Sequence, residues 1–137
     1  MKKLQDTLVY RIMTIKMQLD EVVKEDFQNI GITKENFVTM YFIHENPGIT
    51  QAELAELNHK DRNVITKFID KLEKFQYVKR VQSPADRRSY CLYVTPEGEE
   101  IFAPYWKILT DSEKARLNRL TEDEQKQLMA WLEILMQ

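Results

Sequence analysis

Residues 50–98 read TQAELAELNHKDRNVITKFIDKLEKFQYVKRVQSPADRRSYCLYVTPEG. Thr50 and Glu53 have the spacing of a capping box, in which each side chain accepts a hydrogen bond from a backbone N–H at the start of a helix. This helix is short, because residues 58–60 lack helical periodicity. Asp61 is a good N-cap for a second helix, in which apolar residues recur at helical spacing as far as Phe75. The pattern predicts two helices joined by a tight turn.

A β-hairpin is predicted after the second helix. Its strands are expected at 78–82 and 90–94, and its tip carries Asp86, Arg87 and Arg88. Helix, turn, helix and hairpin in this order are the plan of a winged helix-turn-helix, in which the second helix enters the major groove of DNA and the hairpin contacts a neighbouring groove or the backbone. The alternative interpretation is that the basic residues form a solvated helix face and a polar hairpin loop.

The distribution of charge favours a nucleic-acid partner, although the formal net charge of −2 alone does not. Between residues 60 and 90 there are nine Lys or Arg and four Asp or Glu, so this segment carries +5. The rest of the chain holds eleven basic and eighteen acidic residues and carries −7. A positive module within an acidic body directs one face toward phosphate and keeps the other faces away from it.

Length and composition predict one domain over residues 1–137, since 43% of the residues are hydrophobic. No apolar run approaches the roughly 20 residues that cross a bilayer, so we expect no membrane partner. The N-terminus lacks the apolar core of a signal peptide. The single cysteine, Cys91, excludes an intrachain disulfide. A cytoplasmic location is expected.

Both ends of the chain are predicted to be helices with more apolar surface than a small winged helix domain can cover. The apolar residues of 4–23 and 128–136 are core by default, but together they indicate a surface that a second copy of the chain buries. Two recognition helices related by a twofold axis can bind two half-sites. We therefore expect a mainly α fold with a small β-wing, in which 1–30 and 100–137 form a dimerisation region and 33–98 form the DNA-binding lobe.

Several short motifs follow one another in a fixed order. They are Asn46–Ala55, Val64–Thr66 with Leu72–Lys74, Val78–Arg80, Ser83–Arg88 and Val94–Gly98. In these motifs the chain resembles the MarR family of bacterial transcriptional regulators. The resemblance implies a homodimer that regulates genes, usually as a repressor, by occupying a pseudo-palindromic operator. The family usually has a glycine between the second helix and the first wing strand, whereas this chain has Gln76, which predicts an altered corner.

Eight residues are expected to contact double-stranded DNA. Side chains on the first turns of the second helix can contact base edges, and the N-terminus of the preceding helix suits a phosphate. Arginines at the wing tip suit a minor groove narrowed by A·T sequence. The eight residues are Gln51, Arg62, Asn63, Thr66, Lys67, Lys71, Arg87 and Arg88. Asp86 is expected to accept a hydrogen bond that braces the wing, because its charge would otherwise repel phosphate.

The resemblance implies a small aromatic ligand as an expected further partner, since many members of the family release DNA when a small phenolic, an oxidant or a metal binds. The expected pocket lies between the dimerisation helices and the winged lobe and is lined by Tyr10, Met13, Met17, Phe37, Tyr41 and His44. The alternative is that these residues are core. His44 and His59 lack the spacing of metal ligands, and we interpret Cys91 as an inert strand residue. No metal or cofactor is expected.

Two competing classes of function remain. For an enzyme, the chain would need a glycine-rich phosphate loop, a nucleophile with its base, or a set of metal ligands. It has three glycines in all and none of these patterns, so we expect no catalytic residues. The stronger alternative is a winged helix that serves as a protein–protein or assembly module without specific DNA contacts. The basic face of the second helix argues against this alternative.

Overall fold

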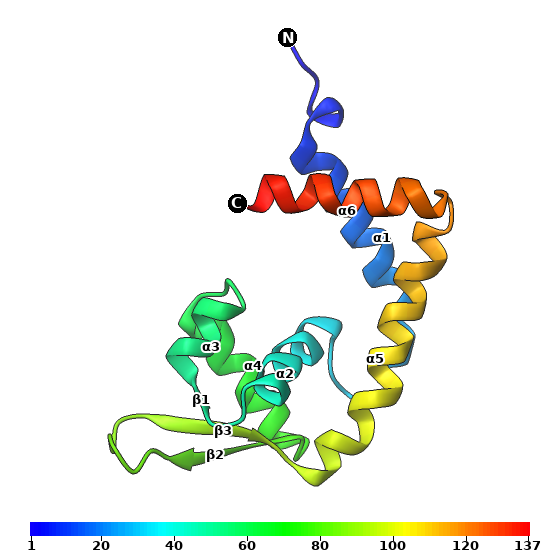
Figure 1. Ribbon diagram of the computed structural model, residues 1–137. Coiled ribbons are helices and arrows are strands. Elements are labelled where there is room, and N and C mark those ends of the chain that lie inside the picture. The colour runs from blue at the N-terminus through cyan, green and yellow to red at the C-terminus, as the bar shows by residue number, and fades with distance from the viewer.

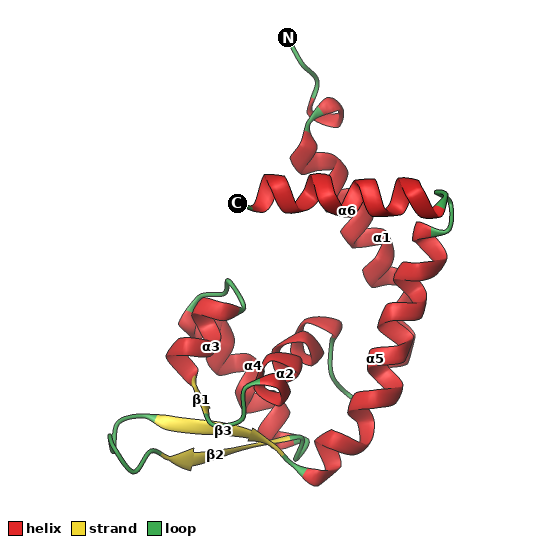
Figure 2. Ribbon diagram, viewed as in Figure 1, coloured by secondary structure: helices red, strands yellow, loops and turns green.

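The computed structural model describes all of residues 1–137 and is mainly helical, with one small sheet (Figures 1 and 2). In chain order the elements are a 3₁₀ helix at Leu4–Asp6, α1 (Leu8–Gln28), α2 (Lys34–Glu45), β1 (Ile49–Thr50), α3 (Gln51–Leu57), α4 (Arg62–Lys74), β2 (Val78–Gln82), β3 (Tyr90–Val94), α5 (Pro96–Leu117) and α6 (Glu122–Met136). None of the helices combines the length and the apolar character that a membrane span requires.

The elements form two parts, as Figure 1 shows. From α2 to β3 the chain folds into a winged lobe, while α1 and α5 lie against each other and form a stem with α6. Helix α6 and both termini lie at the end of the stem that is remote from the wing. The predicted fold class, mainly α with a small β-wing, is confirmed.

The sheet is antiparallel and has the strand order β1-β3-β2. The two hairpin strands occur at the predicted residues, with Val78 opposite Val94 and Gln82 opposite Tyr90. Strand β1 was not predicted, because two residues are too few to show the alternation of a strand. It pairs Ile49 with Leu92 and so joins the start of α3 to the wing.

The capping box predicted at Thr50 forms only in part. The Thr50 hydroxyl oxygen accepts a hydrogen bond from the Glu53 N–H at 3.2 Å, as expected. The Glu53 carboxylate, however, accepts from the Thr50 hydroxyl at 2.8 Å and not from the Thr50 backbone N–H. Thr50 differs from an ordinary N-cap residue because it belongs to strand β1, where it lies opposite Cys91 of β3. A capping box between Thr121 and Glu124, at the start of α6, is complete.

The core connects the stem to the winged lobe. Val23 and Phe27, in the C-terminal part of α1, are buried together with Phe37 of α2. The Phe27 ring lies 5.2 Å from that of Phe37 and 5.4 Å from that of Tyr105 on α5, measured between centroids. Burial of these rings removes much apolar surface from water and provides the main stabilisation of this junction. The N-terminal part of α1 and all of α6 contribute nothing to this core.

The corner between α4 and β2 keeps a left-handed residue at position 76, although glutamine in place of the family's usual glycine predicted an altered corner. Gln76 adopts the left-handed conformation, with φ of 63°. The Tyr77 N–H donates to the Leu72 carbonyl and the Gln76 N–H to the Glu73 carbonyl, both at 2.9 Å, which is the Schellman arrangement of a helix end. The Thr95 hydroxyl donates to the Gln76 carbonyl at 2.5 Å. These contacts hold a conformation that glycine adopts more easily.

We expect Gln76→Gly to stabilise the protein. The left-handed conformation costs a residue with a Cβ about 1–2 kcal/mol, and the greater freedom of glycine in the unfolded chain offsets about 0.5–1 kcal/mol of that gain. The free energy of unfolding in urea should therefore rise by about 0.5–1 kcal/mol. Gln76→Ala is the control, because it removes the same side chain but keeps the Cβ. A gain with alanine as large as that with glycine would contradict this explanation.

Candidate nucleic-acid interface

The turn between α3 and α4 sets the direction of α4. His59 in this turn has φ of 53°, and the Lys60 N–H donates to the Ala55 carbonyl at 3.0 Å. The Asn58 side-chain amide donates to the Thr39 hydroxyl of α2 at 2.8 Å. Thr39 is fully buried, so this hydrogen bond anchors the turn to the interior of the lobe.

Helix α4 has one buried face and one exposed basic face. Its N-cap is Asp61, as predicted, whose carboxylate accepts from the Asn63 N–H at 2.7 Å. Ile65, Ile69 and Leu72 are completely buried against the lobe. Three of the predicted DNA-contacting residues, Arg62, Asn63 and Lys67, are exposed, whereas Thr66 and Lys71 are partly buried at its margins. This is the exposure that insertion of the first turns of α4 into a groove requires.

A hollow of about 390 Å³ lies between α3, α4 and the wing. Its lining includes four residues that were predicted to contact DNA, and these come from three separate segments of the chain. The lining residues are Gln51, Ala52, Arg62, Thr66, Arg88, Ser89 and Tyr90. The structure thus places a wing arginine and the start of α4 around one concave surface.

The Gln51 side chain supports Thr66. Its amide Nε2 donates to Thr66 Oγ1 at 2.6 Å, and Thr66 Oγ1 donates to the Arg62 carbonyl at 2.9 Å. The hydroxyl proton and one lone pair of Thr66 are therefore already used. A base can still contact the Thr66 methyl group or donate to the remaining lone pair. Gln51 therefore positions a residue of α4, a role that its place in the sequence did not suggest.

The tip of the wing is held by hydrogen bonds within the loop. The Asp86 carboxylate accepts from the Arg88 N–H at 2.9 Å, and the Asp86 carbonyl accepts from the Ser89 N–H at 3.0 Å. The Gln82 side chain donates to the Arg87 carbonyl at 2.8 Å. The carboxylate contact is that of an Asx turn. It places Arg87 and Arg88 at an exposed tip.

Arg80, one of the nine basic residues between 60 and 90, is paired with acidic residues of α4. Its Nη2 lies 2.5 Å from Asp70 Oδ1 and its Nη1 3.9 Å from Glu73 Oε1. The side chain is only 23% exposed. Arg80 thus joins strand β2 to the recognition helix and neutralises two carboxylates that would repel phosphate. The spacing of Asp70 and Glu73, three residues apart on one helix, was the signal in the sequence that could have indicated this contact.

The residues predicted to line a ligand pocket fall into two groups: Phe37, Tyr41 and His44 of α2 lie around Phe102 of α5, with ring centroids 5.6, 6.0 and 3.9 Å from it, whereas Tyr10, Met13 and Met17 lie on α1. Phe37 is completely buried in the core, Met17 lines a hollow between α1 and α2, and Tyr41 lines another hollow between α2 and α5. His44 stacks on Phe102 with ring centroids 3.9 Å apart, and its Nδ1 lies 2.9 Å from the Glu99 carboxylate. Tyr10 is partly buried and Met13 is exposed on α1. The core interpretation thus holds for Phe37, and His44 packs at the end of a helix.

The predicted dimerisation region exposes a large apolar surface. No residue of α6 is buried, and Trp131 is 57% exposed. The exposed apolar residues are Leu8, Val9, Ile12, Met13, Ile15, Met17 and Val22 on α1, and Met129, Trp131, Ile134, Leu135 and Met136 on α6. So many exposed apolar residues on two helices are typical of a protein–protein interface.

Comparison with known proteins finds transcriptional regulators. A family model described as MarR family matches residues 32–90. The transcriptional regulator HosA of Escherichia coli O111:H- is 31% identical over 98 residues, which are 72% of this chain and 73% of HosA. The chain spans between 63% and 83% of the length of the curated regulators first matched.

Solved structures agree with the fold. A MarR protein from Peptoclostridium difficile is 26% identical and has a TM-score of 0.90, with 99% of this chain and 90% of that chain covered. The transcriptional repressor CouR, whose structure contains a 23-mer DNA duplex, is 24% identical and has a TM-score of 0.86. It covers the whole of this chain, and 99% of CouR is matched.

Proposed function

Because the chain belongs to the MarR family of transcriptional regulators, we propose that two copies bind one pseudo-palindromic DNA operator and repress the adjacent gene. The observation that carries this proposal is the concave surface between α4 and the wing, which gathers Gln51, Arg62, Thr66 and Arg88. The DNA-bound structure of CouR, which has the same fold, supports the choice of DNA as the partner. A cytoplasmic location goes with this partner.

The two parts of the surface have different tasks in this proposal. Arg62, Asn63, Thr66 and Lys67 on the first turns of α4 contact base edges in the major groove, since only this groove distinguishes all four base pairs. Arg87 or Arg88 enters the adjacent minor groove, and Lys71, the least exposed of these cations, contacts phosphate. The alternative, an assembly module without specific DNA contacts, would leave the cations of this face without a partner.

The homodimer in this proposal is formed by the stem. Helix α6 has an apolar surface that the rest of the chain leaves exposed, and α1 adds a second stripe. A twofold axis through this region places one winged lobe on each half-site, about one helical turn of DNA apart. Release of DNA by a small aromatic ligand remains a prediction. Since Met17 and Tyr41 line different hollows in the single chain, a pocket that includes the residues of both α1 and α2 would need the second copy.

A competition gel shift tests the proposal. The protein is bound to labelled duplex from the region upstream of its gene, and native or random unlabelled duplex is added as competitor. We expect the native duplex to compete far better, and binding to fall by about 10³–10⁵-fold between 50 and 200 mM salt, because several phosphates are neutralised in each half-site. Equal competition by both duplexes, or binding that is insensitive to salt, would instead support the assembly module.

Substitutions on α4 should separate base contacts from phosphate contacts. Arg62→Ala or Asn63→Ala should reduce the discrimination between operator and mutated operator by about 1–3 kcal/mol, because each removes a contact to a base edge. Lys71→Ala should weaken binding to every duplex by a similar factor and reduce the dependence on salt. Titrations on both duplexes at several salt concentrations measure the difference. If both kinds of variant behave alike, the base-contacting face of α4 is wrongly assigned.

A further inference from the structure

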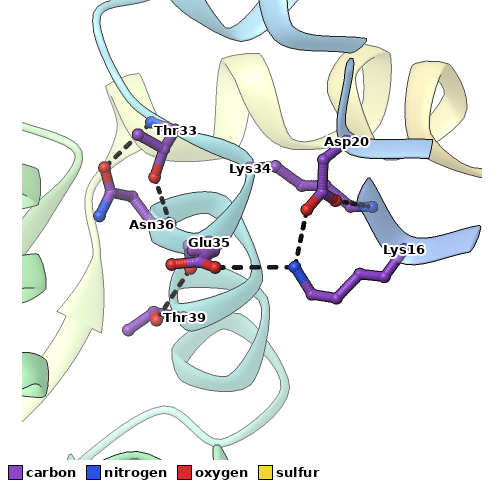
Figure 3. Close-up of polar contacts among 7 residues, drawn as sticks. All are labelled: Lys16, Asp20, Thr33, Lys34, Glu35, Asn36 and Thr39. Carbon is purple, nitrogen blue, oxygen red and sulfur yellow. Dashed lines mark hydrogen bonds and ion pairs between the residues drawn. The ribbon is translucent and has the colours of Figure 1, made fainter. Parts of the chain in front are cut away.

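A charged cluster joins the stem to the winged lobe, as Figure 3 shows. On α1, Asp20 accepts hydrogen bonds from two lysines: Lys16 Nζ lies 2.7 Å from Oδ2, and Lys34 Nζ, on the first turn of α2, lies 2.8 Å from Oδ1. Lys16 also lies 3.7 Å from the Glu35 carboxylate. Lys34 is 18% exposed and Asp20 33%, so the Asp20–Lys34 pair is partly shielded from water. We refer to these four residues as the Asp20 cluster.

The Asp20 cluster lies where it can stabilise the angle between α1 and α2. Helices α1 and α2 are connected at residues 29–33, where Gly31 has φ of 81° and the chain reverses. Asp20 lies about two helical turns before this connection. The ion pair therefore links a point on α1 that is about two turns from the connection to the first residue of α2. A change in the angle between the two helices would separate these two charges.

Helix α2 connects the Asp20 cluster to the turn that precedes α4. The start of α2 is fixed by a complete capping box between Thr33 and Asn36 (Figure 3). One turn later, the Thr39 hydroxyl donates to the Glu35 carbonyl at 3.0 Å and accepts from the Asn58 amide at 2.8 Å. Asn58 is the C-cap of α3, immediately before the turn into α4. A change in the angle between α1 and α2 would therefore move the turn that leads into α4, and with it the direction of α4.

Asp20 remains charged at neutral pH. Burial alone would raise the pKa of Asp20, but hydrogen bonds from Lys16 and Lys34 outweigh burial, so the pKa lies below its ordinary value. Hydrogen bonding to Asp20 raises the pKa of Lys16 despite partial burial. Glu35 also faces Lys16, while Glu21 and Lys24 line the hollow beside the cluster. Asp20 and Lys16 are therefore both charged under the conditions of DNA binding.

We infer that Asp20 is a positioning residue that determines which half-site spacing the dimer prefers. The inference rests on the proposed function, because spacing has meaning only for two lobes on one operator. If α1 belongs to the dimer stem, the angle between α1 and the lobe sets the separation of the two copies of α4. Loss of the Asp20–Lys34 pair would widen the range of angles beyond what the lobe takes with the pair intact, while the Phe27–Phe37 core keeps the lobe attached to the stem. The affinity for the native spacing would fall, while each lobe would keep every one of its DNA contacts.

Asp20→Asn tests this inference, with Glu21→Gln as the matched control. Both variants remove one negative charge beside the same hollow, so they change the electrostatic attraction to DNA by the same amount. Glu21, unlike Asp20, forms no ion pair with Lys16 or Lys34. Affinities are measured for the operator and for versions with one base pair inserted or removed between the half-sites. Asp20→Asn should lower the affinity for the operator with the native spacing by about tenfold. Its affinities for the operators with one base pair inserted or removed should then be similar to that value. Glu21→Gln should keep the preference of the wild type.

Further measurements make the outcome specific. The salt dependence of Asp20→Asn on the operator should match that of Glu21→Gln, since no phosphate contact is lost. Thermal unfolding and sedimentation verify that fold and dimer persist; if Asp20→Asn fails to fold, Lys34→Gln carries the same expectation. A spacing preference that survives in the folded variant overturns the role of Asp20. A wild type without any spacing preference would overturn the proposed function instead.

Discussion

Trp131→Asp is expected to convert the dimer to a monomer and to remove high-affinity operator binding. Trp131 is 57% exposed in the single chain, and α6 buries none of its residues there. In the proposed dimer the indole is buried, so an aspartate would lose about 3–5 kcal/mol of packing in each copy and bury an unpaired charge. Loss of the second lobe should lower the affinity for the operator by about 10²–10⁴-fold, because the two half-sites are no longer bound together.

Sedimentation and a gel shift measure the two effects together. The fold of the single chain should survive, because Trp131 contributes nothing to its core. Val81→Asp is the control for oligomeric state, since Val81 is an apolar residue with 44% exposure that lies on the wing, away from the stem. A Trp131→Asp protein that remains a dimer would show that α6 is not the dimer interface.

Arg88→Ala should have the second large effect. Arg88 lies at the exposed wing tip and lines the hollow that includes Arg62 and Gln51. A hydrogen bond to a charged group contributes about 1.5–3 kcal/mol, and the twofold axis doubles the loss. The affinity for the operator should therefore fall by about 10²–10⁴-fold, measured by fluorescence anisotropy. The thermal midpoint should not change, because the tip is outside the core, and a fall in stability of similar size would mean that the arginine has a structural role.

Asp86→Ala gives a result whose sign discriminates between two explanations. Simple repulsion between the Asp86 carboxylate and phosphate predicts tighter binding when this charge is removed. The hydrogen bond from the Arg88 N–H to the carboxylate predicts weaker binding, because the tip loses the contact that orders it. We expect a loss of about 0.5–1.5 kcal/mol in each lobe. Asp86→Asn keeps an acceptor for the Arg88 N–H without the charge, so it should retain more binding than alanine; tighter binding by Asp86→Ala would contradict the bracing role.

Features that depend on neighbours in the sequence could be predicted without coordinates. Asp61 begins its helix as the N-cap, as expected, because a cap requires only a side-chain oxygen and the two or three residues that follow it. The wing strands occur at 78–82 and 90–94, since a hairpin shows a local alternation and a polar turn. The charge contrast between residues 60–90 and the rest of the chain is a property of composition and needs no fold.

Contacts between residues far apart in the chain depended on tertiary structure. No partner was predicted for Arg80, because its contact with Asp70 follows from the packing of β2 on α4. Asp20 and Lys34 had no recognisable motif, because their contact follows from the angle between α1 and α2. Even Gln76 keeps the left-handed corner that its sequence disfavours, since hydrogen bonds from other parts of the lobe compensate for the local cost. Local patterns specify helices and strands, whereas the relative placement of those elements determines which charges meet, and therefore which remain available for DNA.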